Sequence, residues 1–267
     1  MKRIVALTLA LGAFAGPALA QGRAYESAVA ALPRPEAIEP DLSALIERLR
    51  AAVAAGEAKS IDAELAPDFR TWDCFLDPTK ACVRRDAADP RRQKRYLALK
   101  PGQRIREDLC CRDIAPGRIT PKLRDEATLG AIGAALEDET LGVSPFDPAH
   151  LCAPAPPHFD RAAAARLAQR AEVEGEELRL AARALTLRER PAKEAAEIGV
   201  IAPLSIAPLA TAGDHALPDG WSGFVLPDGR VGYTQDLGAN ELSYAGLCFA
   251  RDSGGRWRIV AAVERKP

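Results

Sequence analysis

The most informative run in this 267-residue chain is Trp221-Ser-Gly-Phe224-Val-Leu-Pro227-Asp-Gly229-Arg-Val-Gly-Tyr233. Apolar residues alternate on both sides of its Pro-Asp-Gly centre, which is the pattern of half-buried strands joined by a turn. Proline presets φ for a turn and glycine accepts positive φ, so the centre predicts a hairpin. We therefore expect Trp221, Phe224 and Leu226 to pack in the core of a β-rich domain.

Further strands are predicted on both sides of this hairpin, at residues 185–188, 198–201, 244–251 and 257–263. The last two flank the turn Asp252-Ser-Gly-Gly255 and form a C-terminal hairpin. Side chains alternate along a strand, so Trp257, Ile259, Ala261 and Val263 should share one face.

The order of these landmarks resembles the bacterial SH3-like (SH3b) domain over residues 185–263. An apolar-x-apolar-Arg strand near a proline comes first, then an Ile-Gly pair, a Trp-led strand, an Asp-Gly turn and a Gly-aromatic pair. The resemblance implies a small β-barrel and a surface between loops that can hold a peptide. On that surface Arg188 and Tyr233 are the candidate ligand-binding residues. The whole layout is similar to that of exported bacterial SH3-domain proteins.

The first 20 residues have the features of a signal peptide. Lys2 and Arg3 precede an apolar run, and Ala18-Leu19-Ala20 forms a small-x-small cleavage site. The apolar run is shorter than the roughly 20 residues that a transmembrane helix needs. We expect no membrane span and an exported protein, periplasmic or secreted, that begins at Gln21.

The overall charge gives no reason to expect a nucleic-acid partner. Removing Lys2 and Arg3 from the 36 basic residues leaves 34, against 37 acidic ones, a net charge of −3. Residues 84–106 are nevertheless strongly basic. They could form a patch for an anionic envelope partner, or a solvated face offset by acidic residues nearby. The second interpretation is favoured, since charge runs usually face water. The offsetting residues would be Asp125, Glu126, Glu137, Asp138 and Glu139.

Six cysteines in an exported chain predict disulfides rather than a zinc site, because no Cys-x-x-Cys spacing is present. They are Cys74, Cys82, Cys110, Cys111, Cys152 and Cys248. Adjacent cysteines fit relaxed disulfide geometry poorly, so Cys110 and Cys111 are each expected to pair elsewhere. Cys248 stands alone in the β-rich part. Two alternatives stay open for it: a crosslink between the two halves, with Cys152 as the preferred partner, or a buried free thiol.

Helices are predicted from residue 41 to a cap at Gly56, from Thr120-Pro121 onward, and over 160–169. Prolines between 145 and 157 mark a natural boundary. The predicted fold class is α+β: a disulfide-stapled, mostly helical domain at 21–158 and a small SH3-like β-barrel with a C-terminal hairpin at 181–267. A helical and acidic connector at 159–180 joins them.

No catalytic, metal or cofactor motif stands out in the chain. The enzyme alternative is a cell-wall cysteine peptidase, because Asp73-Cys74 precedes His150 and His158. A thiolate nucleophile needs such a neighbouring base. The Ser-Gly expected after that cysteine is replaced by Phe75-Leu76, so Cys74 is predicted to be half of a disulfide. His215 has no obvious metal-binding partners. The sequence thus favours a non-catalytic envelope protein that docks on a peptidoglycan peptide or a partner protein.

Overall fold

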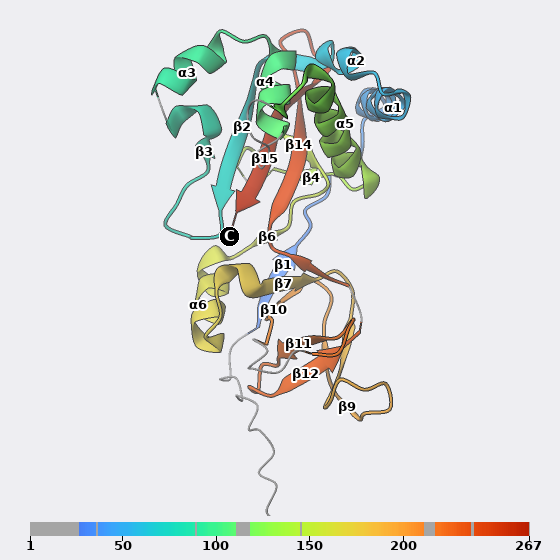
Figure 1. The fold of residues 1–267 in the computed structure, drawn as a ribbon, viewed down its shortest axis with the longest axis vertical. Coiled ribbons are helices and arrows are strands. Elements are labelled where there is room, and N and C mark those ends of the chain that lie inside the picture. Colours follow the sequence, from blue (N-terminus) through green and yellow to red (C-terminus); the bar gives the residue numbers. More distant parts are fainter. Residues whose placement is uncertain are drawn as a thin grey trace, which may run out of the picture.

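The computed structural model describes residues 27–35, 37–88, 90–110, 118–144, 146–210, 217–235 and 238–266. The predicted signal peptide, Cys111 and His215 lie outside these ranges. The described chain is an α+β fold with three sheets, arranged in two lobes. Figure 1 shows the first lobe, with most of the helices, above the second.

A six-stranded sheet in the order β3-β2-β15-β14-β5-β4 forms the first lobe. Its long strands are β2 (Leu65–Phe75), β14 (Tyr244–Arg251) and β15 (Trp257–Lys266), and its short ones are β3 (Val83–Arg84), β4 (Gly142–Val143) and β5 (Leu151–Ala153). β15 pairs antiparallel with β14 and parallel with β2. The centre of the first lobe is therefore built from the C-terminal end of the chain.

Helices cover one face of this sheet. They are α1 (Pro40–Ala55), α2 (Ala58–Asp62), α3 (Pro90–Leu97), α4 (Pro101–Leu109) and α5 (Pro121–Glu137), with the 3-10 turn η1 (Arg85–Ala88) between β3 and α3. The predicted apolar stripe of α1 is buried against the strands. Leu42, Leu45 and Leu49 pack in one core with Phe249 and Ile259.

The predicted helix ends agree closely with the structure. Gly56 closes α1 with φ at 70°, where glycine carries no Cβ penalty. Thr120 caps α5 by accepting a hydrogen bond from the Leu123 amide at 3.2 Å. Asp160 does the same for α6 (Arg161–Ala171).

The second lobe has two sheets. The five-stranded one, in the order β13-β7-β10-β1-β6, contains β1 (Ala28–Ala31), β6 (His158–Phe159), β7 (Leu178–Ala181), β10 (Ser205–Pro208) and β13 (Ala239–Glu241). The four-stranded one, in the order β11-β12-β8-β9, contains β8 (Leu185–Arg188), β9 (Glu197–Ile201), β11 (Ser222–Val225) and β12 (Val231–Thr234). Leu185, Leu187 and Phe224 of the four-stranded sheet share a buried cluster with Ala181 and Ala207 of the five-stranded one.

Two expectations about the architecture are corrected. The helices do not form a separate domain at 21–158, and the C-terminal hairpin belongs to the first lobe rather than to the strands at 181–234. The reason lies in β15, which is apolar on both faces. Ile259 and Ala262 pack on the helix side and Ala261 and Val263 on the other, so β15 needs a central position in a sheet. Within the described residues, the two sheets of the second lobe do not close into a barrel.

The predicted shared face of Trp257, Ile259, Ala261 and Val263 is also wrong. The pairing of β14 with β15 shifts register at Val260, which is the extra residue of a β-bulge. A bulge moves every later side chain to the opposite face. Trp257 and Ile259 consequently pack under the helices, whereas Ala261 and Val263 pack on the far side.

The hairpin around residues 227–229 is confirmed. Gly229 has φ at 82° and donates its amide to Leu226 at 2.8 Å, and β11 and β12 pair on either side. Phe224 and Leu226 are buried as expected. Trp221 is only partly buried and precedes β11, so its expected place in the core is corrected.

Two disulfides are described, Cys74–Cys82 and Cys152–Cys248. Cys110 is disulfide-bonded as well, while the pairing expected for Cys111 lies outside the described residues. The preferred partner of Cys248 was therefore right, but the bond does not join two halves. Cys152 and Cys248 lie opposite each other on the neighbouring strands β5 and β14 of one sheet. The chain between the two cysteines contains every element of the second lobe except β1, so the bond ties together the two ends of that segment.

Candidate functional site

A cleft of about 430 Å³ lies in the first lobe. Its walls are α4 and α5, and its floor is formed by β14 and β15, with Gly246 and Glu264 among the floor residues. Arg85 and Thr71 also line it. The volume lies in the range of small-molecule and peptide side-chain sites.

Small side chains on α5 make room for the cleft. Ala131, Ala134 and Ala135 line it, and their spacing places them on one face of the helix. The larger residues Ile132 and Leu136 pack in the main core instead. Residues with longer side chains at the three alanine positions would fill the space between α5 and the sheet.

Arg85 is the centre of a buried charge network beside the cleft. Its guanidinium donates to Asp73 Oδ1 at 2.6 Å, to the Asp108 carbonyl at 3.0 Å, and to Glu264. Asp73 and Glu264 lie side by side because their Cα atoms are partners between β2 and β15. The Arg85 side chain is 7% exposed. One arginine thus holds two neighbouring strands and the end of α4 together.

A second group of polar side chains lies on the carboxylate of Asp108, at the last turn of α4. Thr71 donates its hydroxyl to this carboxylate at 2.7 Å, and Tyr96 of α3 donates its own. All three side chains are buried. Burial and the charge of Asp108 raise the pKa of Tyr96, so its hydroxyl keeps the proton that it donates.

The charges of the cleft are fixed and slightly acidic. Arg85 is the cation in its lining, against the carboxylates of Asp108 and Glu264. Burial alone would lower the pKa of Arg85, but Asp73, Glu264 and Asp108 raise it above its ordinary value. Such a lining favours a ligand group that donates hydrogen bonds, such as an amine or amide.

Acid stability should depend on Asp73. Burial alone would raise the pKa of Asp73, but Arg85 and then Lys266 hold it below its ordinary value of 3.8. A carboxylate with a depressed folded-state pKa contributes stability above its unfolded pKa and loses it as the pH falls through the folded value. We expect the free energy of unfolding to fall steeply below about pH 4, and Asp73→Asn to flatten that fall while lowering stability at pH 7.

Urea unfolding between pH 2 and pH 7 measures this effect. Asp68→Asn is the matched control, because Asp68 is exposed on the same strand. An acid limb of equal steepness in wild type and Asp73→Asn would contradict the assignment.

The basic segment 84–106 is only in part the solvated face that the sequence favoured: Lys94, Arg95 and Lys100 are exposed, but other cations of the segment are buried. Arg85 lies in the network above, and Arg104 is buried and donates to the carbonyls of Tyr96, Leu97 and Pro67. Arg106 pairs with Asp62 and Asp125, both at 2.5 Å. Only the contact with Asp125 follows the expected acidic offset. Several of these cations organise the interior.

The two SH3-like candidate residues lie directly opposite each other, Arg188 on β8 and Tyr233 on β12. Tyr233 is 4% exposed and packs beside Gly223. Arg188 donates to the Ala195 carbonyl at 2.7 Å and contacts Glu197 at 3.3 Å. The structure brings the pair together, with the tyrosine ring inside the lobe.

The residues of the peptidase alternative are placed as follows. The Cys74 sulfur is bonded to Cys82 at 2.05 Å, and a disulfide sulfur is not a thiolate. His158 lines the same pocket as this disulfide, with Nε2 at 2.9 Å from the Val143 carbonyl. His150 lies 3.4 Å from Asp147. No group of three metal-ligating side chains gathers within the described ranges.

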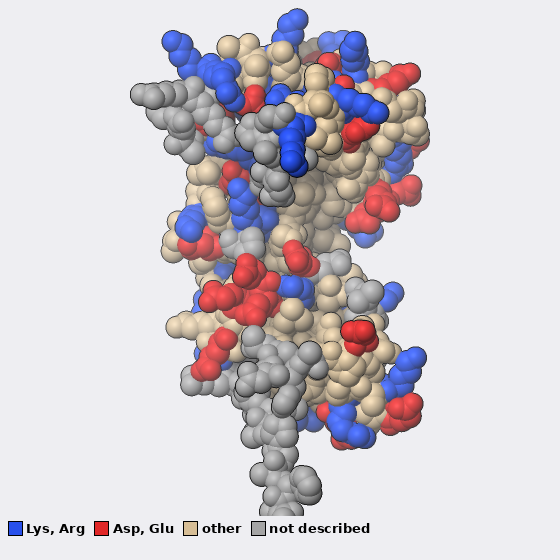
Figure 2. Space-filling model, in the orientation of Figure 1, with Lys and Arg blue, Asp and Glu red and all other residues tan. Residues whose placement is uncertain are grey.

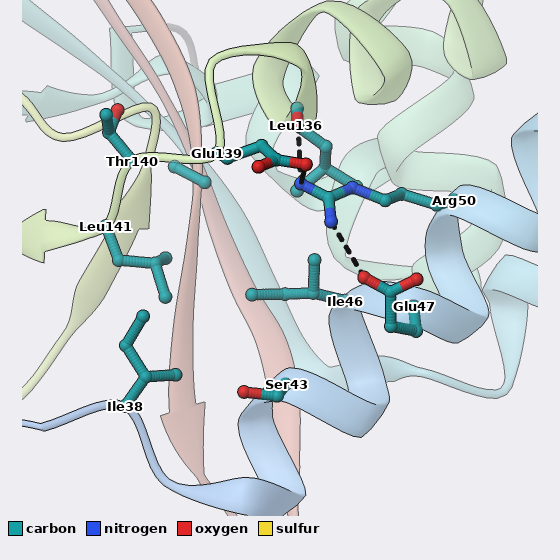
Figure 3. A pocket seen from close by; sticks show the side chains of 10 residues that line it. Ile38, Ser43, Ile46, Glu47, Arg50, Leu136, Glu139, Thr140 and Leu141 are labelled. Carbon is teal, nitrogen blue, oxygen red and sulfur yellow. Dashed lines mark hydrogen bonds and ion pairs between the residues drawn. The ribbon is translucent and has the colours of Figure 1, made fainter.

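A smaller pocket of about 180 Å³ lies between α1 and the end of α5. Figure 3 shows Arg50 reaching from α1 to Glu47 and to the Leu136 carbonyl, at 2.7 and 3.0 Å. Glu139 lies 3.4 Å from the same guanidinium. The rest of the lining is mainly apolar, with Ile38 and Leu141 facing each other. Arg50 is thus paired with both carboxylates of the pocket, and the apolar remainder is contact between packed elements.

Sequence reasoning missed the cleft because its signals are weak in isolation. The alanines at positions i, i+3 and i+4 of α5 could have indicated a helix face that leaves a cavity. Thr71 and Asp73 are two residues apart on a strand, which could have indicated that both side chains lie on the same face. No feature of the sequence distinguishes Arg85 from the other arginines around it.

Among the described helices, none combines the length and apolarity needed to cross a membrane. No protein-family model, curated protein or solved structure matches this chain.

Proposed function

We propose that this is a non-catalytic binding protein of the bacterial cell envelope, periplasmic or secreted, whose ligand lies in the cleft of the first lobe. The ligand is a peptidoglycan peptide or a segment of a partner protein. The observation that supports the proposal is the cleft bounded by the Arg85 network. Its charged groups are held by hydrogen bonds before any ligand arrives, which reduces the ordering that binding must impose.

The chemistry of the cleft favours recognition over reaction. Asp73 and Glu264 are bound by Arg85, and Asp108 is bound by Thr71 and Tyr96, so these groups orient a partner rather than move protons. A peptide offers amine and amide donors to such carboxylates, and the alanine face of α5 offers an apolar wall. The described disulfides are consistent with an oxidising compartment.

We also propose that the second lobe is an SH3-like module. The landmarks at 185–233 and the pairing of β8 with β9 and β12 support that identity. Its cross-strand pair Arg188–Tyr233 has a buried aromatic ring, so the ligand site is placed in the first lobe. In this proposal the SH3-like module contributes to the scaffold of the protein.

Binding of soluble peptidoglycan stem peptides, measured by calorimetry, tests the proposal. Ala134→Leu extends a side chain into the cleft from its exposed rim and is expected to weaken binding at least about tenfold, about 1.4 kcal/mol. Ala51→Leu is the control, because Ala51 is exposed on the outer face of α1 and lines none of the pockets described above. Mass spectrometry should recover the peptides uncut.

Two results would contradict the proposal. One is equal affinity of Ala134→Leu and wild type for a peptide that binds. The other is cleavage of the peptide by reduced protein that disappears in Cys74→Ala, which would establish the peptidase alternative.

A further inference from the structure

A second pocket, of about 230 Å³, lies where the two lobes meet. The ends of β2 and β15 supply Cys74, Phe75 and Arg265, and the second lobe supplies His158 and Phe159 of β6 and Arg161 of α6. Figure 1 shows the C-terminal end of the chain beside α6 and the end of β2. None of these residues belongs to the Arg85 cleft.

Arg265 is a buried cation with an unused donor. Its side chain is 6% exposed, and Nη2 donates to the Pro157 carbonyl at 3.1 Å. The guanidinium also faces the rings of Phe159 and Tyr244, at 5.0 and 5.8 Å. Nη1 is buried and has no hydrogen-bond partner. A buried charged donor left in this state is costly unless something binds it.

A second arginine adds to the positive charge. Arg161 donates from Nη1 to the carbonyls of Phe75, Asp77 and Lys80, at 3.2, 3.3 and 2.8 Å. Within the described residues, no carboxylate forms an ion pair with Arg161 or Arg265. Burial, with a smaller contribution from Arg161, lowers the pKa of Arg265 to about 10, so the Arg265 guanidinium is still charged at neutral pH.

Two acidic residues beside the contacts of Arg161, Asp77 and Asp160, have carboxylates that are engaged elsewhere. The Asp77 carboxylate accepts from Thr79 at 2.7 Å and faces Lys80 at 3.5 Å. The Asp160 carboxylate accepts from two backbone amides at the start of α6. The pocket therefore holds two cations for which no described residue supplies a counter-charge.

We propose that this pocket binds the oxyanion group of a ligand, a carboxylate or a phosphate, through Arg265 and Arg161. An arginine presents its donors in a planar fork that matches both groups. Phe75, Pro157 and Phe159 form an apolar wall for the rest of the ligand. Since both lobes supply residues, the bound anion holds them together, and this site operates independently of the Arg85 cleft.

Calorimetry and thermal unfolding of the full chain with two kinds of probe test the site. Inorganic phosphate represents the phosphate group, and N-acetylalanylalanine represents a carboxylate, with its C-terminal amide as the uncharged control. Ionic strength is kept constant with chloride. We expect one of the two anions to bind and to raise the melting temperature, and the amide to do neither.

Variants then locate the binding. Arg265→Gln and Arg161→Gln should each weaken it at least tenfold and remove the rise in melting temperature. Arg166→Gln should leave both unchanged, because it removes the same charge from an exposed position on α6. If Arg265→Gln does not fold, Arg161→Gln decides alone. Binding to phosphate alone or to the dipeptide alone identifies the ligand group. Binding of neither anion, or undiminished binding in the folded variants, overturns the proposal.

Discussion

Replacing Arg85 by Met is expected to lower the free energy of unfolding by about 3 kcal/mol. The guanidinium is nearly buried and bonds Asp73, Glu264 and the end of α4. Its removal leaves two adjacent carboxylates facing each other across β2 and β15. Breaking a buried ion pair on one side typically costs about 3–5 kcal/mol. The lower end applies because Lys266 still lies 3.2 Å from Asp73.

Arg95→Met is the matched control for this variant, within the same basic segment. Arg95 is 71% exposed and pairs with Glu107, so its loss should cost less than about 1 kcal/mol. Urea unfolding with an unchanged m-value gives both numbers. Equal costs for the two variants would show that Arg85 is an ordinary surface arginine.

Removing the Cys152–Cys248 bond is expected to lower the free energy of unfolding by about 2–5 kcal/mol. The two cysteines are 96 residues apart, and the loop between them contains most of the second lobe. In the entropic model, opening a loop of about 100 residues restores about 4.7 kcal/mol of unfolded-chain freedom. Both side chains are fully buried, so the alanine pair also leaves a small cavity.

The Cys74–Cys82 bond serves as the comparison, since it spans only 8 residues. The same model gives about 2.5 kcal/mol for it. Urea unfolding of the Cys152→Ala/Cys248→Ala and Cys74→Ala/Cys82→Ala proteins should rank them in that order. The reverse ranking, or alkylation of Cys248 in native protein without reductant, would contradict the described pairing and its role.

Features that depend on neighbours in the sequence were predicted well. Caps at Gly56, Thr120 and Asp160 follow from the conformational preferences of those residues, and the turn at 227–229 follows from its proline and glycine. The preference of Cys248 for Cys152 was also confirmed. These features require only a few residues or one pair to be assigned.

Features that depend on distant pairing were not predictable. The strands of the C-terminal hairpin were found, but alternation indicates only that a strand has buried faces and does not identify its neighbours. β15 pairs with β2 almost 200 positions earlier, and β1 joins β6 and β10 of the second lobe. The bulge at Val260 has no turn residue to signal it.

The Arg85 cleft was not predictable for the same reason, because it is formed by residues that are distant in the sequence. Its lining comes from six segments of the chain, and the arginine that organises it lies in a run that otherwise resembles a solvated surface. Charge at the surface is a poorer guide. Figure 2 shows acidic side chains gathered at the level of α6, and none of the pockets described above is lined by residues of the acidic run 172–177.

The most direct test of the binding proposal is to map where a peptidoglycan stem peptide contacts the protein, using methyl-labelled alanines and NMR. We predict shift changes at Ala131, Ala134 and Ala245, which line the cleft, and loss of the changes at Ala131 and Ala245 in the folded Ala134→Leu variant. Shift changes confined to the strands around Arg188 and Tyr233, or none at saturating peptide, would contradict it.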